Sequence, residues 1–217
     1  MKFDQPFWNK VNQRLQNECF EHSDRLRNLL KLIKDFIEEH MDEYTNVSSH
    51  PFVIAIDGRA ASGKSTLAEQ LGKLLDADVI HMDDFFLPPQ LRSDNRLAEA
   101  GGNVHYERFC EEVLPHLTLS VAFSYRIFDC SRMDYNGERT IENHCFRIVE
   151  GSYSHHPKFG DYADLFVFSD VEAEEQMRRI RLRNGEEKAQ MFAKKWIPME
   201  ERYFDEFNVR RVTDLNI

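Results

Sequence analysis

Apolar residues in positions 1–44 recur with the spacing of two amphipathic helices. The first stripe comprises Trp8, Val11, Leu15 and Cys19, and the second comprises Leu26, Leu29, Leu30, Ile33 and Ile37. Charged residues occupy the opposite face of the second helix. We therefore predict an N-terminal helical hairpin in an extension over residues 1–48. Its apolar stripe would either pack on the rest of the chain or form the surface of a homo-oligomer.

From residue 52 onward, short apolar runs of strand length alternate with segments of helical spacing. The predicted strands are 52–57, 79–82, 145–151, 163–168 and 212–217, and the predicted helices are 66–75, 106–117, 171–183 and 186–196. We expect Pro198 to end the last of these helices. Continuous apolar strands that alternate with helices are typical of a parallel sheet covered on both faces. The pattern predicts an α/β fold, with three α/β/α layers and a mostly parallel five-stranded sheet, in a domain over residues 49–217.

Two segments interrupt this alternation. Residues 90–104 are polar and end in two glycines and an asparagine, which predicts a mobile loop. Residues 121–128 have the apolar and aromatic content of a strand, and Asn136-Gly137 is a two-residue turn signal. We therefore expect a small β-hairpin that turns at Asn136 and Gly137.

One motif of known chemistry follows the first long strand. The stretch GRAASGKS at residues 58–65 matches GxxxxGK[ST], and it lies between a predicted strand and a predicted helix. Glycines let such a loop turn tightly, so that backbone N–H groups and the positive end of the helix face an anion. The sequence therefore predicts a P-loop NTPase fold. The expected nucleotide-binding residues are Gly58, Arg59, Ala60, Ala61, Ser62, Gly63, Lys64, Ser65 and Thr66.

The composition narrows the range of partners. The 217 residues carry a net charge of −10, which argues against nucleic acid or an anionic membrane as the main partner. No apolar run approaches membrane-spanning length, and the first residues lack a signal-peptide pattern. The four cysteines are widely spaced, as suits free thiols in a reducing compartment. We therefore expect a cytoplasmic protein that binds neither nucleic acid nor a membrane.

Acidic residues lie at the ends of two predicted strands. Asp83 and Asp84 follow the strand at 79–82, and Glu150 lies near the end of the strand at 145–151. Ligands bind at the carboxyl ends of strands in open parallel sheets, so these carboxylates should lie near the phosphate-binding loop. Phosphoryl transfer requires a carboxylate that accepts the proton of the acceptor hydroxyl, and ligands for Mg²⁺ beside the phosphates.

These segments together resemble the uridine kinase-like P-loop kinases, a group that includes phosphoribulokinase and pantothenate kinase. The resemblance covers about residues 51–217, and the N-terminal hairpin lies outside it. The segments that carry it are Gly58–Ser65, Asp83–Phe86, Asn103–Phe109, Ile148–Gly151 and the arginine-rich Arg178–Gly185.

The resemblance implies an ATP- and Mg²⁺-dependent kinase that transfers the γ-phosphate to a small-molecule hydroxyl, with a nucleoside as the expected acceptor. Lys64 would hold the β- and γ-phosphates, and Ser65 with Glu150 would hold Mg²⁺. Asp83, rather than its neighbour Asp84, matches the catalytic aspartate of the group.

The arginines at 178, 179, 181 and 183 match a lid over residues 178–195 that closes on the phosphates. Successive helical positions point about 100° apart, so the four side chains cannot all face the site. We favour Arg183, which matches the arginine of the group's lid motif, and Arg179, which lies one turn earlier.

The sequence departs from the uridine kinases on the acceptor side. His105 stands where the group carries an aspartate that holds the ribose hydroxyls, and Phe86 replaces a tyrosine. Phe128 and Asp129 match a Tyr-Asp-Phe segment, but the histidine that follows it is missing. Since an imidazole cannot grip two hydroxyls as a carboxylate does, these four candidate acceptor-binding residues support kinase chemistry better than they support uridine as the acceptor.

Two other functions are compatible with the same residues. A nucleotide-binding regulatory protein would use the N-terminal helices to bind a partner. A kinase for a non-nucleoside or a nucleoside monophosphate is the other alternative. A monophosphate acceptor would need additional basic residues near the pocket, and the candidates are Arg92, Arg96, Arg108 and Arg126.

Overall fold

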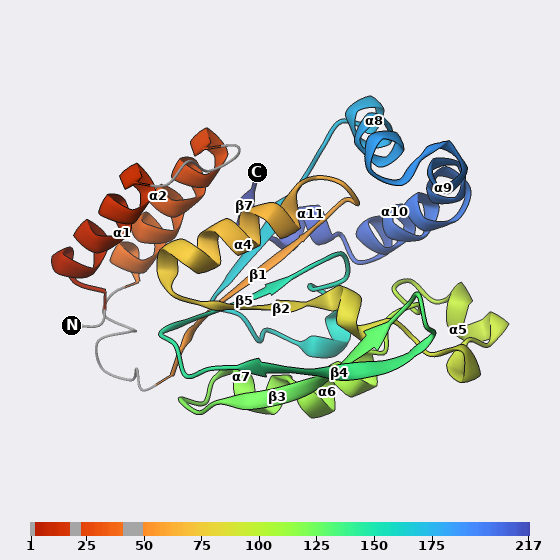
Figure 1. Cartoon of the computed structure of the whole chain (residues 1–217), viewed down its shortest axis with the longest axis horizontal. Helices are drawn as coiled ribbons and strands as arrows, with labels where there is room; N and C mark the ends of the chain where they lie inside the picture. The colour runs from red at the N-terminus through yellow and green to blue at the C-terminus, as the bar shows by residue number, and fades with distance from the viewer. Residues whose placement is uncertain (1–2, 18–22, 41–49) are drawn as a thin grey trace.

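A five-stranded sheet forms the centre of the computed structural model, which describes residues 3–17, 23–40 and 50–217 (Figure 1). Its strands are β1 (Phe52–Gly58), β2 (Asp78–His81), β5 (Phe146–Glu150), β6 (Leu165–Ser169) and β7 (Leu215–Asn216). They lie in the order β2-β5-β1-β6-β7, and every pairing is parallel. The predicted α/β fold with a parallel five-stranded sheet is therefore confirmed.

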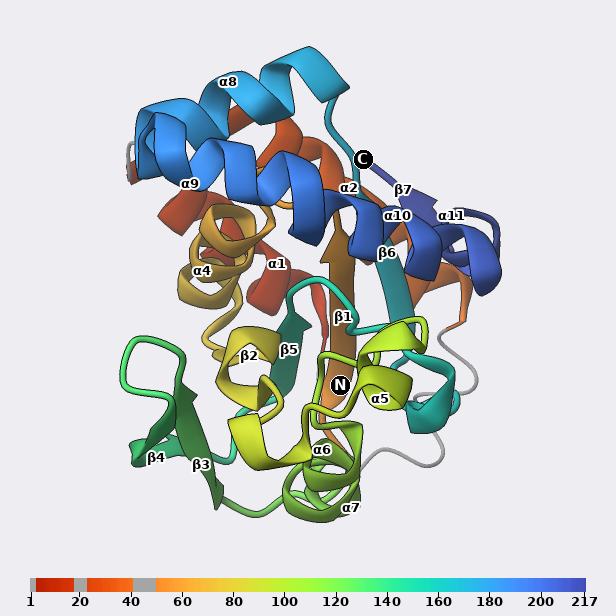
Figure 2. The same ribbon diagram turned by 90° about the vertical axis from the view of Figure 1, so that its right-hand side faces the viewer.

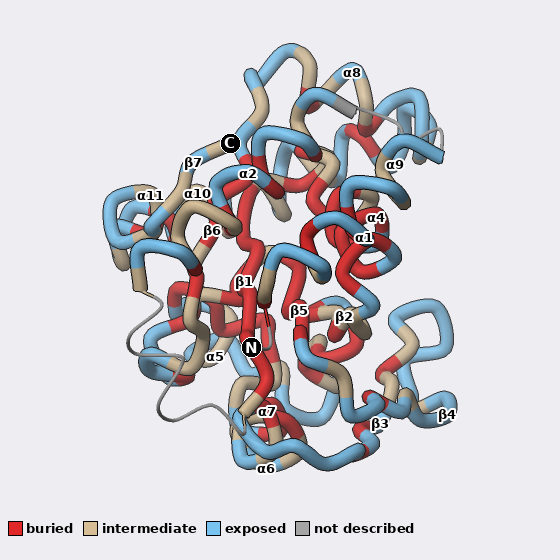
Figure 3. Tube along the Cα trace, turned by 90° about the vertical axis from the view of Figure 1, so that its left-hand side faces the viewer, coloured by how far each residue is buried: buried red, intermediate tan, exposed pale blue. Residues whose placement is uncertain are grey.

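Helices cover both faces of this sheet (Figure 1). They are α1 (Gln5–Asn17), α2 (Ser23–Glu39), α4 (Lys64–Leu75), α5 (Asp94–Ala98), α6 (Tyr106–Glu112), α7 (Leu114–Leu117), α8 (Ala173–Asn184), α9 (Glu186–Met191), α10 (Ile197–Glu206) and α11 (Val209–Val212). Successive side chains of a strand point to opposite faces, and β1 is buried along its whole length. Phe52, Ile54 and Ile56 pack in a cluster with α1, α2 and α4, whereas Val53 packs in a second cluster with α6, α7 and α10. Figure 3 shows the buried residues concentrated along β1, β5 and α4.

The N-terminal hairpin packs on the chain's own domain. Leu26, Leu29, Ile33 and Ile37 are fully buried and belong to the same hydrophobic cluster as β1 and α4. Of the two alternatives for this stripe, packing within the chain is the one that the structure supports. The stripe is therefore not available as the surface of a homo-oligomer. The predicted boundary between residues 48 and 49 lies outside the described residues.

The β-hairpin exists, but its turn lies elsewhere than predicted. It pairs β3 (Phe123–Asp129) with β4 (Asp134–Ile141), and residues 130–133 form the turn. Asn136 and Gly137 lie inside β4, where the pairing register shifts between Arg126 and Phe128. Gly137 has a φ of 86°, a conformation that both a tight turn and a β-bulge use. The Asn-Gly signal was therefore correct for the backbone conformation and wrong for the turn.

Other element boundaries also differ from the predictions. Pro198 does not end the helical region, because it lies in the first turn of α10, directly after a π-helical turn that continues the helix from α9. A π-helical turn over residues 192–196 joins α9 to α10. The predicted loop at 90–104 contains the short helix α5, and the predicted helix at 106–117 divides into α6 and α7 near Val113.

The structure also describes three of the four cysteines and the apolarity of the helices. Cys110, Cys130 and Cys145 are free thiols, whereas Cys19 lies outside the described residues. Among the described residues, no helix combines the length and apolarity that a bilayer crossing requires.

The buried side chain of His156 should make the stability of the fold depend on pH. Its ring lies among Tyr106, Phe159, Tyr203 and Phe207 and is 4% exposed. Burial lowers the pKa of His156 from 6.5 to about 4. Between these pH values the unfolded chain binds a proton that the folded chain does not, so stability falls as the pH decreases. We expect the free energy of unfolding to lose up to about 3 kcal/mol from this group between pH 6.5 and pH 4.

The measurement is urea unfolding across this pH range for the wild type and for His156→Phe, which keeps an aromatic ring and removes the titrating nitrogens. Carboxylates titrate in both proteins, so the difference in slope isolates His156. Identical slopes in the two proteins would contradict the assignment.

Candidate active site

The phosphate-binding loop has the backbone conformation that the motif predicts. The loop leaves β1 at Gly58, whose φ is 143°, and a Cβ there would lie 2.0 Å from the carbonyl oxygen of Ser169. Ala61 and Gly63 also have positive φ values, of 59° and 92°. The 12-residue helix α4 begins immediately afterwards at Lys64. The loop therefore presents backbone N–H groups and a helix N-terminus to one place, which is an arrangement that binds phosphate.

A pocket of about 890 Å³ opens beside this loop. It lies where α8, α9 and α10 cross the carboxyl ends of the sheet strands (Figure 2). Of the nine predicted nucleotide-binding residues, the ones that line the pocket are Ala60, Ala61, Gly63, Lys64, Ser65 and Thr66. The Nζ of Lys64 donates to the carbonyl oxygen of Arg59 at 3.2 Å. The side chain of Arg59 points elsewhere, because its Nε pairs with Glu201 at 2.7 Å.

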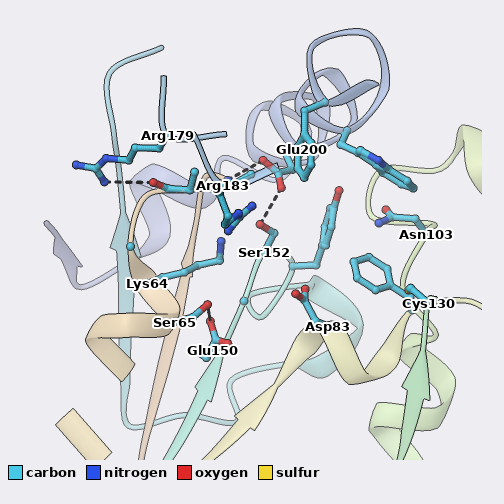
Figure 4. Close-up of a pocket in the computed structure, with 18 of the residues that line it drawn as sticks. Lys64, Ser65, Asp83, Asn103, Cys130, Glu150, Ser152, Arg179, Arg183 and Glu200 are labelled. Atoms are coloured by element: carbon cyan, nitrogen blue, oxygen red, sulfur yellow. Dashed lines mark hydrogen bonds between the residues drawn. The ribbon is translucent and has the colours of Figure 1, made fainter. Parts of the chain in front are cut away.

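The structure separates the roles of the two adjacent aspartates. Asp83 lines the pocket opposite the phosphate-binding loop (Figure 4). Asp83 is exposed to the pocket, but the protein atoms that surround it desolvate its carboxyl group and raise its pKa, and the charge of Lys64 opposes this rise. Asp84 instead accepts a hydrogen bond from the hydroxyl of Tyr125 at 2.9 Å and pairs with Arg139 at 3.2 Å. Asp83 therefore faces the pocket, whereas Asp84 holds the hairpin against the domain.

Glu150 and Ser65 form the predicted pair beside the loop. The Oγ of Ser65 donates to Oε2 of Glu150 at 3.0 Å (Figure 4). The other carboxylate oxygen lies 2.6 Å from Nδ1 of His81. Although burial opposes it, the Glu150 carboxylate raises the pKa of His81. His81 was not among the predicted site residues, although it lies at the end of β2, and proximity to that strand end was the reason for selecting Asp83.

These oxygen donors fit Mg²⁺. Hydroxyl and carboxylate oxygens are its preferred ligands, and it is bound through one or two carboxylates plus substrate phosphates rather than in an all-protein cage. Ser65 and Glu150 lie where the loop would bring phosphate oxygens to complete the coordination.

The arginines of α8 divide as helical geometry requires. Arg178, Arg179 and Arg183 line the pocket. Arg179 donates to the carbonyl oxygens of Ala61 at 3.2 Å and Ser62 at 3.4 Å, so it contacts the loop backbone. Arg183 donates to the side chain of Asn184 at 2.8 Å and points toward Lys64 in Figure 4. Both favoured arginines are thus at the site.

The predicted acceptor-binding residues do not converge. Phe86 lines the pocket, but His105, Phe128 and Asp129 do not. Phe128 is buried against Tyr135, and Asp129 is half-buried and accepts hydrogen bonds from the turn of the hairpin. His105 precedes α6, where burial lowers the pKa of its ring. These three residues therefore lie outside the pocket lining, because matching a segment does not fix the direction of its side chains.

Seven further residues line the rest of the pocket. They are Arg92, Asn103, Cys130, Met133, Tyr153, Phe192 and Trp196. Asn103 belongs to the matched segment, two positions before His105, and its side chain is 5% exposed. Cys130 and Met133 come from the β3–β4 turn that Asp129 caps.

Glu200 is the pocket residue that sequence gave least reason to expect. It lies on α10, accepts from the backbone N–H of Ala60 at 3.0 Å, and accepts from the hydroxyl of Ser152 at 3.0 Å (Figure 4). Burial raises the pKa of Glu200, and the charge of Lys64 opposes this rise. Its carboxylate ties the lid region to the phosphate-binding loop and to the segment after β5.

Comparisons with known proteins define the fold. No protein-family model and no curated protein matches the sequence. A solved structure of a possible uridine kinase from Bacillus stearothermophilus matches with a TM-score of 0.60 and 18% identity, over 85% of this chain and 98% of that one. A protein from Silicibacter sp. TM1040 described as a fructose transport system kinase matches with a TM-score of 0.63 and 22% identity, over 79% and 92%. D-glycerate 3-kinase from Cryptococcus neoformans matches with a TM-score of 0.60 and 16% identity, over 82% and 87%. The chain therefore has the fold of the uridine kinase-like P-loop kinases.

Proposed function

We propose that the protein is an ATP- and Mg²⁺-dependent kinase that transfers the γ-phosphate of ATP to a hydroxyl group of a small molecule. The observation that carries this proposal is the placement of Asp83, Lys64 and the Ser65–Glu150 pair around one pocket. These are the parts that phosphoryl transfer needs: a cradle for the phosphates, oxygen ligands for a metal, and a carboxylate for the acceptor.

Each side chain has a distinct task in this reaction. Asp83 orients the acceptor hydroxyl and takes its proton, while the hydroxyl oxygen bonds to the γ-phosphorus and the bond from that phosphorus to ADP breaks. Lys64 and the loop N–H groups stabilise the negative charge on the β- and γ-phosphates. Ser65 and Glu150 would hold Mg²⁺, directly or through water, and the bound ion neutralises charge that develops on the phosphates.

The lid arginines supply the remaining positive charge. Arg179 and Arg183 lie on the side of the pocket opposite Asp83 (Figure 4). Preorganised cations that face the transferring phosphate stabilise the transition state. We propose that closure of α8 and α9 over bound ATP brings Arg183 onto the phosphates.

The residues that line the rest of the pocket, which we call the acceptor wall, do not select one substrate class. The possible uridine kinase, the fructose transport system kinase and glycerate kinase that share the fold differ in the acceptors that their names give. Arg92 is the one of the four candidate basic residues that lines the pocket. Arg96, Arg108 and Arg126 are paired with Glu107 or Glu112. A nucleoside remains our first candidate acceptor, and a small hydroxy compound with one anionic group is the second, because Arg92 could pair with that group.

An acceptor screen tests this function. Purified protein with Mg²⁺-ATP is mixed in turn with nucleosides, nucleoside monophosphates, sugars and hydroxy acids, and ADP release is measured with and without each compound. We expect ADP release to rise at least about tenfold above the rate without acceptor for one class. Nucleotide binding without acceptor-dependent turnover across the panel would favour the regulatory alternative, in which the N-terminal helices bind a partner.

A further inference from the structure

Arg25 connects the N-terminal hairpin to the phosphate-binding loop. It lies in the first turn of α2, far in sequence from the segments that it contacts. Its guanidinium group donates to the carbonyl oxygen of Ser62 at 2.7 Å, to Oγ of Ser169 at 2.6 Å and to the carbonyl oxygen of Ile217 at 3.0 Å. Three acceptors from the loop, the end of β6 and the segment after β7 therefore meet at one side chain.

The contact with Ser62 fixes the peptide that precedes Gly63. In a trans peptide the C=O of one residue and the N–H of the next point in opposite directions. Arg25 and Arg179 both donate to the Ser62 carbonyl, at 2.7 Å and 3.4 Å, and hold it on the outside of the loop. The N–H of Gly63 is thereby directed to the inner side, where Gly63 lines the pocket. Gly63 has a φ of 92°, a conformation that glycine adopts readily, and it has no side chain that could hold this peptide in place.

Ser169 extends the same support. Its hydroxyl accepts from Arg25 and donates to Oγ of Ser62 at 2.8 Å, and Ser62 is fully buried. The carbonyl oxygen of Ser169 accepts from the N–H of Arg59 at 3.2 Å. Arg25 thus holds a buried chain of hydrogen bonds that reaches both halves of the loop.

Arg25 also brings positive charge close to the phosphate-binding loop. A Cβ on Gly63 would lie 3.7 Å from one nitrogen of Arg25 and 3.9 Å from one of Arg179. Burial lowers the pKa of Arg25, the neighbouring charge of Arg179 lowers it further, and the charge of Asp170 opposes this decrease. Two guanidinium groups side by side repel each other, and an anion bound in the loop relieves that repulsion.

We propose that Arg25 is a positioning residue for the phosphates of the nucleotide, which makes the N-terminal hairpin part of the nucleotide site. It acts in two ways, by orienting the Ser62–Gly63 peptide and by adding positive charge behind the loop. This inference rests on the proposed function only in that ATP binds at the loop. It assigns a function to α2 that packing of its apolar stripe does not require.

Arg14 provides a matched control within the same hairpin. It lies on α1 and donates to the carbonyl oxygens of Lys73 at 3.3 Å and Leu74 at 3.0 Å, at the far end of α4. Like Arg25, it ties the hairpin to the domain through backbone oxygens and does not line the pocket, but its acceptors lie at the end of α4 and not in the phosphate-binding loop. Arg14→Ala therefore removes hairpin docking without removing support from the loop.

The test compares Mg²⁺-ATP and Mg²⁺-ADP binding by titration calorimetry for the full-length wild type, Arg25→Ala, Arg25→Gln and Arg14→Ala. Thermal unfolding without nucleotide reports the cost to the fold. We expect both Arg25 variants to bind each nucleotide about tenfold more weakly, or about 1.4 kcal/mol. Arg14→Ala should stay within about twofold of the wild type while losing a similar amount of thermal stability.

Three outcomes would overturn the inference. Wild-type affinity in an Arg25 variant would show that the loop needs no support from α2. Equal losses of affinity in the Arg14 and Arg25 variants would reduce Arg25 to hairpin docking. Absence of nucleotide binding in the wild type would overturn this inference and the proposed function together, whereas the first two outcomes leave the proposed function intact. If Arg25→Ala does not fold, Arg25→Gln decides the question, because it keeps a hydrogen-bond donor and most of the side-chain volume.

Discussion

Asp83→Asn is expected to lower the turnover number for phosphate transfer by about 10³-fold, the range of a lost general base, while Mg²⁺-ATP affinity stays within about twofold. The amide keeps the shape of the carboxyl group but cannot accept the acceptor proton. Asp83 does not contact the loop backbone through a hydrogen bond in the described structure, so the part of the site that binds the ATP phosphates is left unchanged. Turnover with the best compound from the acceptor screen, and nucleotide affinity by calorimetry, are the two measurements.

Asp84→Asn is the control for this experiment. It removes the same charge one residue away, and with it the ion pair with Arg139, while the amide oxygen can still accept from Tyr125. We expect a stability loss of about 1–3 kcal/mol, seen as a lower unfolding temperature, with transfer that stays measurable. The assignment of the catalytic carboxylate would be reversed if Asp83→Asn kept full turnover and Asp84→Asn lost it.

The sequence predicted those parts of the site whose residues are contiguous. A P-loop is one segment, so Gly58, Lys64 and Ser65 could be recognised together, and backbone conformation follows from the glycines. Asp83 and Glu150 could be placed because parallel strands end at the same edge of a sheet. Each of these inferences requires only the ends of the strands and a parallel sheet, which the apolar pattern indicates.

The acceptor wall could not be predicted in the same way. Its residues come from loops whose side-chain directions depend on tertiary contacts. Asn103 faces the pocket while His105, two residues later, does not, and Cys130 faces it while Asp129 caps a turn. Matching a segment to a family motif therefore identifies the part of the sequence that lies near the site, but it does not identify which side chains face the pocket.

Long-range contacts of the loop were missed for a different reason. Glu200 bonds to Ala60 across 140 positions of sequence, and Arg25 bonds to Ser62 from a hairpin outside the resemblance. The prediction that Pro198 ends the helical region also hid Glu200, because it placed residue 200 outside any helix. Both residues support the same loop from opposite sides, so much of its preorganisation comes from segments without a motif.

Glu150→Gln should raise the Mg²⁺ concentration for half-maximal phosphate transfer by about 10- to 100-fold. The amide oxygen can still accept from Ser65, and the amide NH2 can donate to Nδ1 of a neutral His81, so both contacts that hold the strand end can persist. What is lost is the negative charge that would attract a divalent cation, directly or through water. Excess Mg²⁺ should therefore restore part of the activity, since a weakened metal site can be filled by mass action.

Glu138→Gln supplies the control, because it makes the same change of net charge on exposed β4, away from the pocket. Its Mg²⁺ dependence should match the wild type, which separates a local metal ligand from a general effect of charge. Unchanged Mg²⁺ dependence in Glu150→Gln would leave that carboxylate only its observed contacts with Ser65 and His81. The acid at the end of β5 would then be structural, and the metal would depend on Ser65 and the phosphates alone.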